Sequence, residues 1–137
     1  MGDLDRFRDA HADTFDQALA EIRDGRKVSH WMWFIFPQIA GLGRSSTAQF
    51  YALADLDEAR AFLADPVLGK NLRAISEALL TLAGKCSAAE IFGPVDAMKL
   101  KSSMTLFAHA APEAPIFSEV VQAFFDGEED SLTLALI

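Results

Sequence analysis

Apolar residues recur at steps of three and four along most of this chain, which is the spacing of one helix face. The first series runs from Leu4 through Phe7, His11 and Phe15 to Ile22. It predicts an amphipathic helix that a glycine at position 25 can end. Later series predict helices over 58–64, 66–82, 95–109 and 116–125, and a short last helix that ends at position 137. We therefore expect a single all-α domain over residues 1–137, with seven or eight helices.

Helix starts are marked by side chains that can accept hydrogen bonds from the unpaired N–H groups of a first turn. Four positions have such residues, namely Ser45 or Ser46, Asp55 or Asp57, Ser87 with Glu90, and Asp130 or Ser131. The spacing of Ser87 and Glu90 is that of a capping box, in which each side chain bonds the other residue's backbone. These signals support the helical interpretation and place the boundaries.

One segment, from His30 to Gln38, departs from the helical pattern. It reads His-Trp-Met-Trp-Phe-Ile-Phe-Pro-Gln and contains both tryptophans of the chain. Its apolar residues neither alternate nor leave a polar face, so the pattern does not decide between a buried helix and a buried strand, and Pro37 ends it either way. Aromatic residues dominate buried area, so we expect this block to form core, pocket wall or both.

The helix predicted over 95–109 carries a polar stripe. At about 100° per residue, Asp96, Lys99 and Ser103 fall on one side, and Lys101 projects on the opposite side. If Lys101 points to solvent, the other three point inward between large apolar side chains. Because buried charges are rare unless paired, Asp96 and Lys99 then form either a structural ion pair or the wall of a pocket. A rotated helix would leave the stripe solvated.

Composition narrows the function classes. The chain has 137 residues, 51% of them apolar, and a net charge of −8. This charge opposes binding to phosphate backbones, so we expect no nucleic-acid partner. The single cysteine, Cys86, excludes an internal disulfide, and no Cys/His cluster has zinc spacing, so we expect no metal and no cofactor.

Two further observations concern location. The longest unbroken apolar run, 31–36, is too short to span a bilayer. The start of the chain has neither a basic region nor an apolar stretch of the kind that forms a signal peptide. We expect a soluble, cytoplasmic protein with no membrane partner.

Three motifs together carry a resemblance to a known family. They are the aromatic block at 30–38, Gly-Leu-Gly-Arg-Ser-Ser at 41–46, and Asp-Ala-Met-Lys-Leu-Lys-Ser-Ser-Met-Thr-Leu-Phe at 96–107. The chain resembles the domain of unknown function 1810 family, small all-α bacterial proteins. The resemblance implies that the aromatic block is helical, and it brings no established activity. The label "calpastatin" on some members does not suit this chain, because inhibitors of that type are long, disordered and repetitive.

Most residues in these motifs are aromatic or polar. This composition is typical of a small-molecule pocket, whereas motifs that only stabilise a fold are mostly apolar with small turn residues. The candidates for catalysis are His30, Asp96 and Lys99. The candidates for ligand binding are Trp31, Trp33, Gln38, Ser45, Ser46, Tyr51, Ser102, Ser103 and Thr105.

Two functions remain open. In the first, a pocket between Trp31/Trp33 and the helix carrying 96–103 binds a nucleotide- or ADP-ribose-like molecule, as a binding protein or an enzyme. In the second, the chain is a structural or protein-interaction module without catalytic activity. Its apolar face at 117, 121, 124 and 125 would then bind a partner or form a homodimer.

Overall fold

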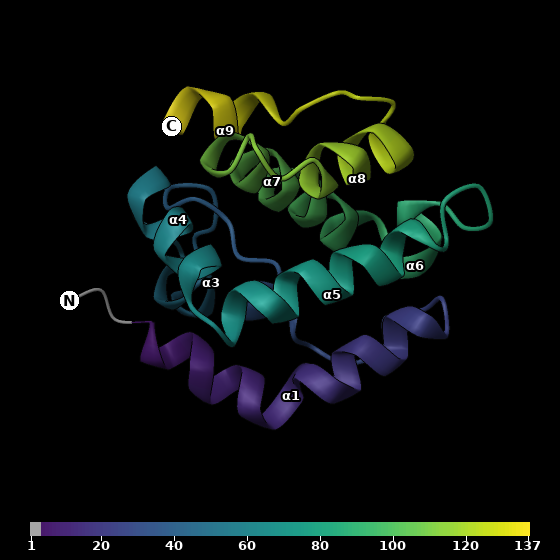
Figure 1. The fold of residues 1–137 in the computed structure, drawn as a ribbon, viewed down its shortest axis with the longest axis horizontal. Coiled ribbons are helices and arrows are strands. Elements are labelled where there is room, and N and C mark those ends of the chain that lie inside the picture. Colours follow the sequence, from purple (N-terminus) through teal and green to yellow (C-terminus); the bar gives the residue numbers. More distant parts are fainter. Residues whose placement is uncertain (1–3) are drawn as a thin grey trace.

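A computed structural model describes residues 4–137, and Figure 1 shows that this part of the chain is a set of helices joined by loops. Its nine helices are α1 (Asp5–Arg23), α2 (Met32–Ile35), α3 (Ser46–Phe50), α4 (Leu56–Ala64), α5 (Leu68–Leu80), α6 (Ala88–Phe92), α7 (Pro94–Ala110), α8 (Ile116–Phe125) and α9 (Ser131–Leu136). The all-α prediction is confirmed, with more helices than the seven or eight expected. The first residues of the segment considered for a signal peptide, 1–3, lie outside the described residues.

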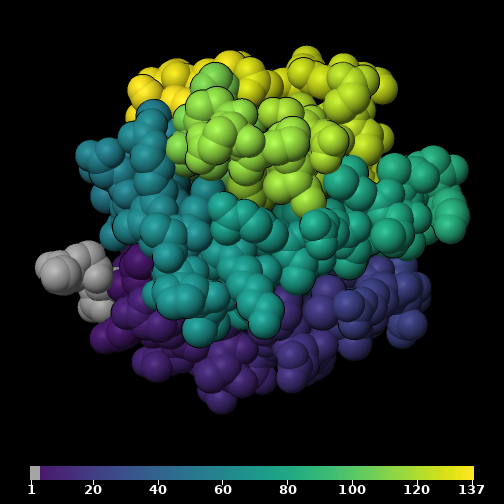
Figure 2. Space-filling view, viewed as in Figure 1, coloured from purple at the N-terminus to yellow at the C-terminus, as the bar shows by residue number. Residues whose placement is uncertain are grey.

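The helices lie in layers, with α1, then α5, then α7 and α8, and finally α9 (Figure 1). The space-filling view in Figure 2 shows the same order at the surface, from α1 below to α9 above. Helix α5 packs on α1, α4 and α8, whereas α7 packs on α4, α6, α8 and α9. Large fully buried side chains, among them Phe7, Trp31, Phe62 and Phe107, fill the space between the layers. Helix α7 is therefore surrounded by other elements.

The predicted cap residues begin the helices where the sequence placed them. Ser45 Oγ accepts a hydrogen bond from the Ala48 N–H at 3.1 Å, and Asp55 accepts one from the Glu58 N–H at 2.8 Å. Ser87 and Glu90 form the full capping box at the start of α6. At the start of α9, the Asp130 carboxylate accepts the Thr133 N–H at 3.0 Å. Local hydrogen bonds thus fix the helix boundaries, as expected from the sequence.

The aromatic block forms only one helical turn, α2, so the helix implied by the family resemblance is shorter than the block. Phe36 leaves the helix with φ −124° and ψ 72°. The cause is Pro37, because the residue before a proline is pushed out of the helical region. The chain then runs extended, and Ile39 forms one parallel bridge with Leu53. This extended segment brings Gln38 and its neighbours alongside α7.

Two predictions about which helix faces point outward are wrong. Lys101 does not face open solvent, because its ammonium pairs with Glu128 at 3.0 Å and its side chain is only 14% exposed. The segment before α9 covers this side of α7. The proposed interaction face on α8 is also largely covered, since Phe117 and Val121 are buried.

Candidate functional site

A hollow of about 250 Å³ lies beside the first half of α7, and we call it the Lys99 hollow. The extended segment after α2, the first half of α7 and the start of α9 enclose it. Its lining residues are Gln38, Leu42, Gly43, Val95, Met98, Lys99, Ser102, Asp130 and Leu132. It combines an apolar mouth with a few polar groups, which is the usual make-up of a small-molecule site.

The ammonium group of Lys99 occupies a defined position at this hollow. It lies 3.3 Å from the Asp96 carboxylate and 4.9 Å from the centre of the Trp33 ring, over its face. An indole face attracts a cation, so Trp33 and Asp96 together orient the lysine. The predicted pair of Asp96 and Lys99 is therefore present, and Trp33 is its aromatic neighbour.

A second lysine, which the sequence analysis missed, shares the same carboxylate. Lys27 lies 2.8 Å from Asp96, and its side chain is 7% exposed, against 24% for Lys99. The Lys27 ammonium also lies 5.2 Å from the centre of the Trp31 ring. Two cations thus share one anion, with the buried one inside and the more accessible one at the hollow. Lys27 stands far from Asp96 in the sequence, so no local spacing could have indicated it.

Asp130 supplies the buried anionic group of the hollow. Its Oδ2 accepts hydrogen bonds from Ser102 Oγ at 3.2 Å, from the Thr133 N–H at 3.0 Å and from Thr133 Oγ1 at 2.7 Å. Its Oδ1 accepts none from the residues that the structure describes. The carboxylate is therefore held rigidly by one oxygen, and its other oxygen is available as an acceptor.

Comparisons with known proteins agree with this fold. A family model described as "Protein of unknown function (DUF1810)" matches residues 1–137. The chain belongs to this family. Its fold is similar to that in the crystal structure of the conserved hypothetical protein Rv1873 from Mycobacterium tuberculosis, with a TM-score of 0.95 and 43% identity. That match covers 98% of this chain and 96% of the other. The comparison with curated proteins found no match.

Of the candidates predicted from the motifs, the structure of this DUF1810 member brings Gln38, Lys99 and Ser102 to the hollow. Trp33 does not line the hollow, but its ring lies against the ammonium of Lys99, which does. Ser103 does not line it, because its side chain is fully buried and its Oγ has no hydrogen-bond partner among the described residues.

The remaining candidates lie elsewhere. Trp31 is fully buried, and its Nε1 donates to Glu21 Oε1 at 2.9 Å, which makes it a core residue. Thr105 is buried and donates to the Lys101 carbonyl at 2.8 Å. Its Oγ1 also accepts the Asp130 N–H at 3.0 Å, so Thr105 supports a lining residue without lining the hollow itself.

The polar candidates near the surface are also outside the lining. His30 is exposed, just before α2. Ser45 caps α3, and Ser46 is the first residue of that helix. Tyr51 packs against the rings of Phe7, Phe34 and Phe50.

Within residues 4–137, no three His, Cys, Asp or Glu side chains gather as a metal ion would need. The same part of the chain has no helix with the length and apolar composition to cross a membrane. The polar groups that line the Lys99 hollow are an ammonium, a carboxylate, a hydroxyl and an amide.

Proposed function

We propose that the Lys99 hollow binds a small molecule that carries an anionic group and hydroxyls, of the nucleotide- or ADP-ribose-like class. The observation that carries this proposal is the position of Lys99. Its ammonium stands at the hollow and shares its counter-ion, Asp96, with Lys27. Because one carboxylate serves two ammonium groups, this corner keeps a positive charge that attracts a phosphate.

Two other lining residues of the hollow suit hydroxyl groups. The available Oδ1 of Asp130 can accept a hydrogen bond from a sugar hydroxyl, and the Gln38 amide can both donate and accept. A ligand with phosphate and hydroxyls at a sugar-like spacing would use Lys99 and these two residues at once. A plain anion would use only the lysine.

The size of the hollow limits what it can enclose. Its volume, about 250 Å³, lies below the usual range of small-molecule sites. We infer that it encloses one sugar–phosphate unit. The rest of a nucleotide would lie over the apolar mouth, where Val95, Met98 and Leu132 are exposed. Such a surface suits the flat face of a base.

The test is a thermal-shift titration with ribose 5-phosphate, AMP and ADP-ribose. A ligand that binds only the folded protein raises Tm with concentration. We expect a shift that Lys99→Met abolishes, and that Lys85→Met, a change at an exposed lysine in the turn after α5, leaves intact. The proposal is wrong if none of the three compounds raises Tm, or if the Lys99→Met protein responds like the unmodified one.

A second candidate function rests on a different observation. Helix α9 exposes Leu132 and Leu136, one turn apart on the same face, although α8 does not offer the face that the sequence suggested. Exposed apolar patches mark interaction surfaces, and a second copy of this chain is the partner we propose for this one. Sedimentation should then show a dimer that Leu136→Glu dissociates. A monomer at all concentrations contradicts it.

A further inference from the structure

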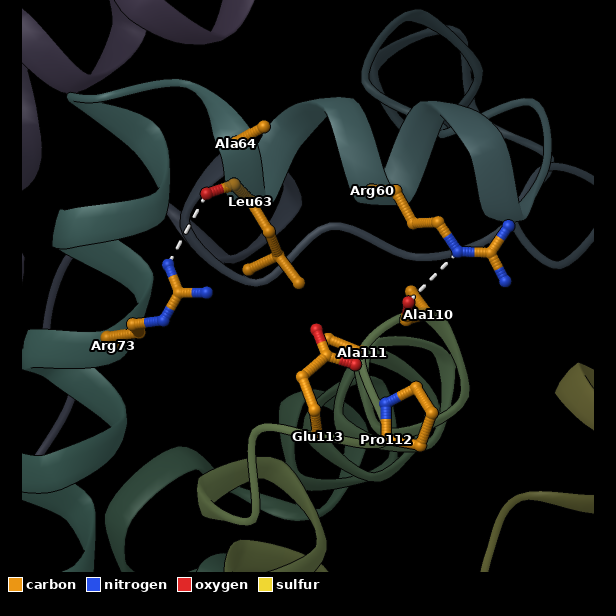
Figure 3. A pocket seen from close by; sticks show the side chains of 8 residues that line it. All are labelled: Arg60, Leu63, Ala64, Arg73, Ala110, Ala111, Pro112 and Glu113. Carbon is orange, nitrogen blue, oxygen red and sulfur yellow. Dashed lines mark hydrogen bonds between the residues drawn. The ribbon is translucent and has the colours of Figure 1, made fainter.

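A second hollow, of about 400 Å³, lies where the carboxyl ends of α4 and α7 meet the side of α5. We call it the Arg73 hollow. Figure 3 shows its lining, with Arg73 on one side and Glu113 on the other. Ser102 and Ala110 are eight residues apart on α7, which is ~12 Å along a helix. The Arg73 hollow is therefore separate from the Lys99 hollow.

Two arginines hold the helix ends in place here. The Arg60 Nε donates to the Ala110 carbonyl at 3.0 Å, and its Nη1 lies 3.1 Å from the Asp57 carboxylate. The Arg73 Nη1 donates to the Leu63 carbonyl at 3.3 Å. The charge of Arg60 is thus met by a carboxylate, whereas Arg73 forms no ion pair with any described residue.

On the Arg73 side of the hollow, the backbone of α5 lies close to the end of α4. A Cβ on Gly69 would lie 2.0 Å from the Leu63 carbonyl oxygen and 2.9 Å from Arg73 Nη1. Only glycine therefore lets α5 come close enough for Arg73 to reach the end of α4. The guanidinium, on an exposed side chain, therefore reaches the end of α4 with one hydrogen bond and has donors left over for another partner.

An opposite charge stands across the hollow. Glu113 follows α7, and its carboxylate reaches into the hollow towards Leu63 in Figure 3. It forms no ion pair with the residues that the structure describes. Between the two charges the lining is apolar, with Leu63 and Ala111 buried and Pro112 at the edge. Besides Arg60, which pairs with Asp57, the hollow is thus lined by one cation, Arg73, and one anion, Glu113, that form no ion pair with each other.

We propose that the Arg73 hollow binds a free amino acid as a zwitterion. The ligand carboxylate pairs with Arg73, whose guanidinium matches a carboxylate with two parallel hydrogen bonds. The ligand ammonium pairs with Glu113, which follows the carboxyl end of α7 and has no cationic partner among the described residues. An apolar ligand side chain then packs on Leu63 and Pro112.

Ligands with a single charge fit this arrangement less well. An anion alone would be repelled by Glu113. A cation alone would be repelled by Arg60 and Arg73. A zwitterion completes both missing ion pairs, and the volume lies within the usual range for small-molecule sites.

The proposal can be tested on the unmodified protein by isothermal titration with three related compounds. L-leucine carries both charges, leucinamide lacks the carboxylate, and N-acetyl-leucine lacks the ammonium. We expect L-leucine to bind, and each single-charge compound to bind about tenfold more weakly or worse, because each leaves one charge of the hollow unpaired. No binding of L-leucine at millimolar concentration, or equal binding of either analogue, overturns the proposal.

Two variants and two matched controls test which side chain binds each charged group of the ligand. Arg73→Gln and Glu113→Gln should each weaken L-leucine binding about tenfold. Lys70→Gln, on α5 outside this hollow, and Glu119→Gln, on α8, change charged side chains of the same sign at exposed positions and should not weaken it.

Two outcomes with the variants count against the proposal. Tighter binding by the Glu113→Gln protein would mean that the hollow binds an anion only, and would overturn the zwitterion. Loss of L-leucine binding in the Lys99→Met protein would place the amino acid in the other hollow, which also overturns it. Failure of this site leaves the nucleotide titration at the Lys99 hollow unaffected.

Discussion

Replacing Asp96 by Asn is expected to destabilise the fold, because it removes the only carboxylate that pairs with the buried Lys27 ammonium among the described residues. Breaking a buried ion pair by removing one partner costs about 3–5 kcal/mol, because the other charge is left uncompensated. Asp96 is partly exposed and an Asn oxygen can still accept a hydrogen bond, so we take the lower end, about 3 kcal/mol. For a chain of this length that lowers Tm by about 10 °C.

The second part of this prediction is that a further substitution restores some of the lost stability. Adding Lys27→Met to Asp96→Asn removes the stranded charge and leaves an apolar side chain against Trp31, so the double variant should be more stable than Asp96→Asn alone. Lys99→Met alone should change stability by less than about 1 kcal/mol, because partly exposed ion pairs contribute little.

Urea unfolding followed by tryptophan fluorescence measures these differences, because Trp31 and Trp33 lie against the two lysines. The comparison is between midpoints at constant slope m. The reasoning is refuted if Asp96→Asn is as stable as the unmodified chain. It is also refuted if Lys27→Met fails to improve the Asp96→Asn protein.

Three further changes are expected to act through the fold. Gly69→Ala should strongly lower the urea midpoint, because its Cβ would lie 2.0 Å from the Leu63 carbonyl oxygen, and wild-type stability would contradict this. Burial lowers the pKa of His11 below its ordinary value of 6.5, so the stability it contributes is present above pH 6.5 and is lost as pH falls from there towards its folded pKa. His11→Gln should flatten the decline in Tm between pH 7 and pH 5, and an unchanged slope would refute this role. Burial alone would raise the pKa of Glu21, but hydrogen bonds from the Ser29 hydroxyl and from nearby N–H groups hold it at about 2. Glu21→Gln should therefore lower Tm at pH 7 and remove the loss of stability between pH 4.5 and pH 2, and a Tm profile like that of the unmodified chain would contradict this.

Local patterns predicted the helices well because the interactions that set them are local. The capping box of Ser87 and Glu90 spans three residues, and the structure contains it as expected. The same holds for Asp96 and Lys99, which are one helical turn apart and form the predicted pair. Signals that depend on neighbours in the sequence could therefore be interpreted from the sequence alone.

The orientation of α7 could not be predicted, because this helix is covered on nearly every side. Choosing Lys101 as the outward residue assumed that one face is solvated, yet the segment before α9 covers it and Glu128 pairs with it. Periodicity orients a helix only when its faces differ in exposure. The error placed Ser103 on a pocket wall, whereas of the two serines predicted to bind a ligand only Ser102 lines the hollow.

The residues that define the two candidate sites come from distant parts of the chain, and two of them also stabilise the fold. Asp130 caps α9 and presents one oxygen to the Lys99 hollow, and Arg73 bonds the end of α4 while facing Glu113. A substitution at such a residue therefore changes packing and recognition together. Lys99 is the most informative position to change, because Asp96 keeps Lys27 when Lys99 is removed. A Lys99→Met protein that melts normally and no longer responds to ribose 5-phosphate would therefore assign that residue to the ligand.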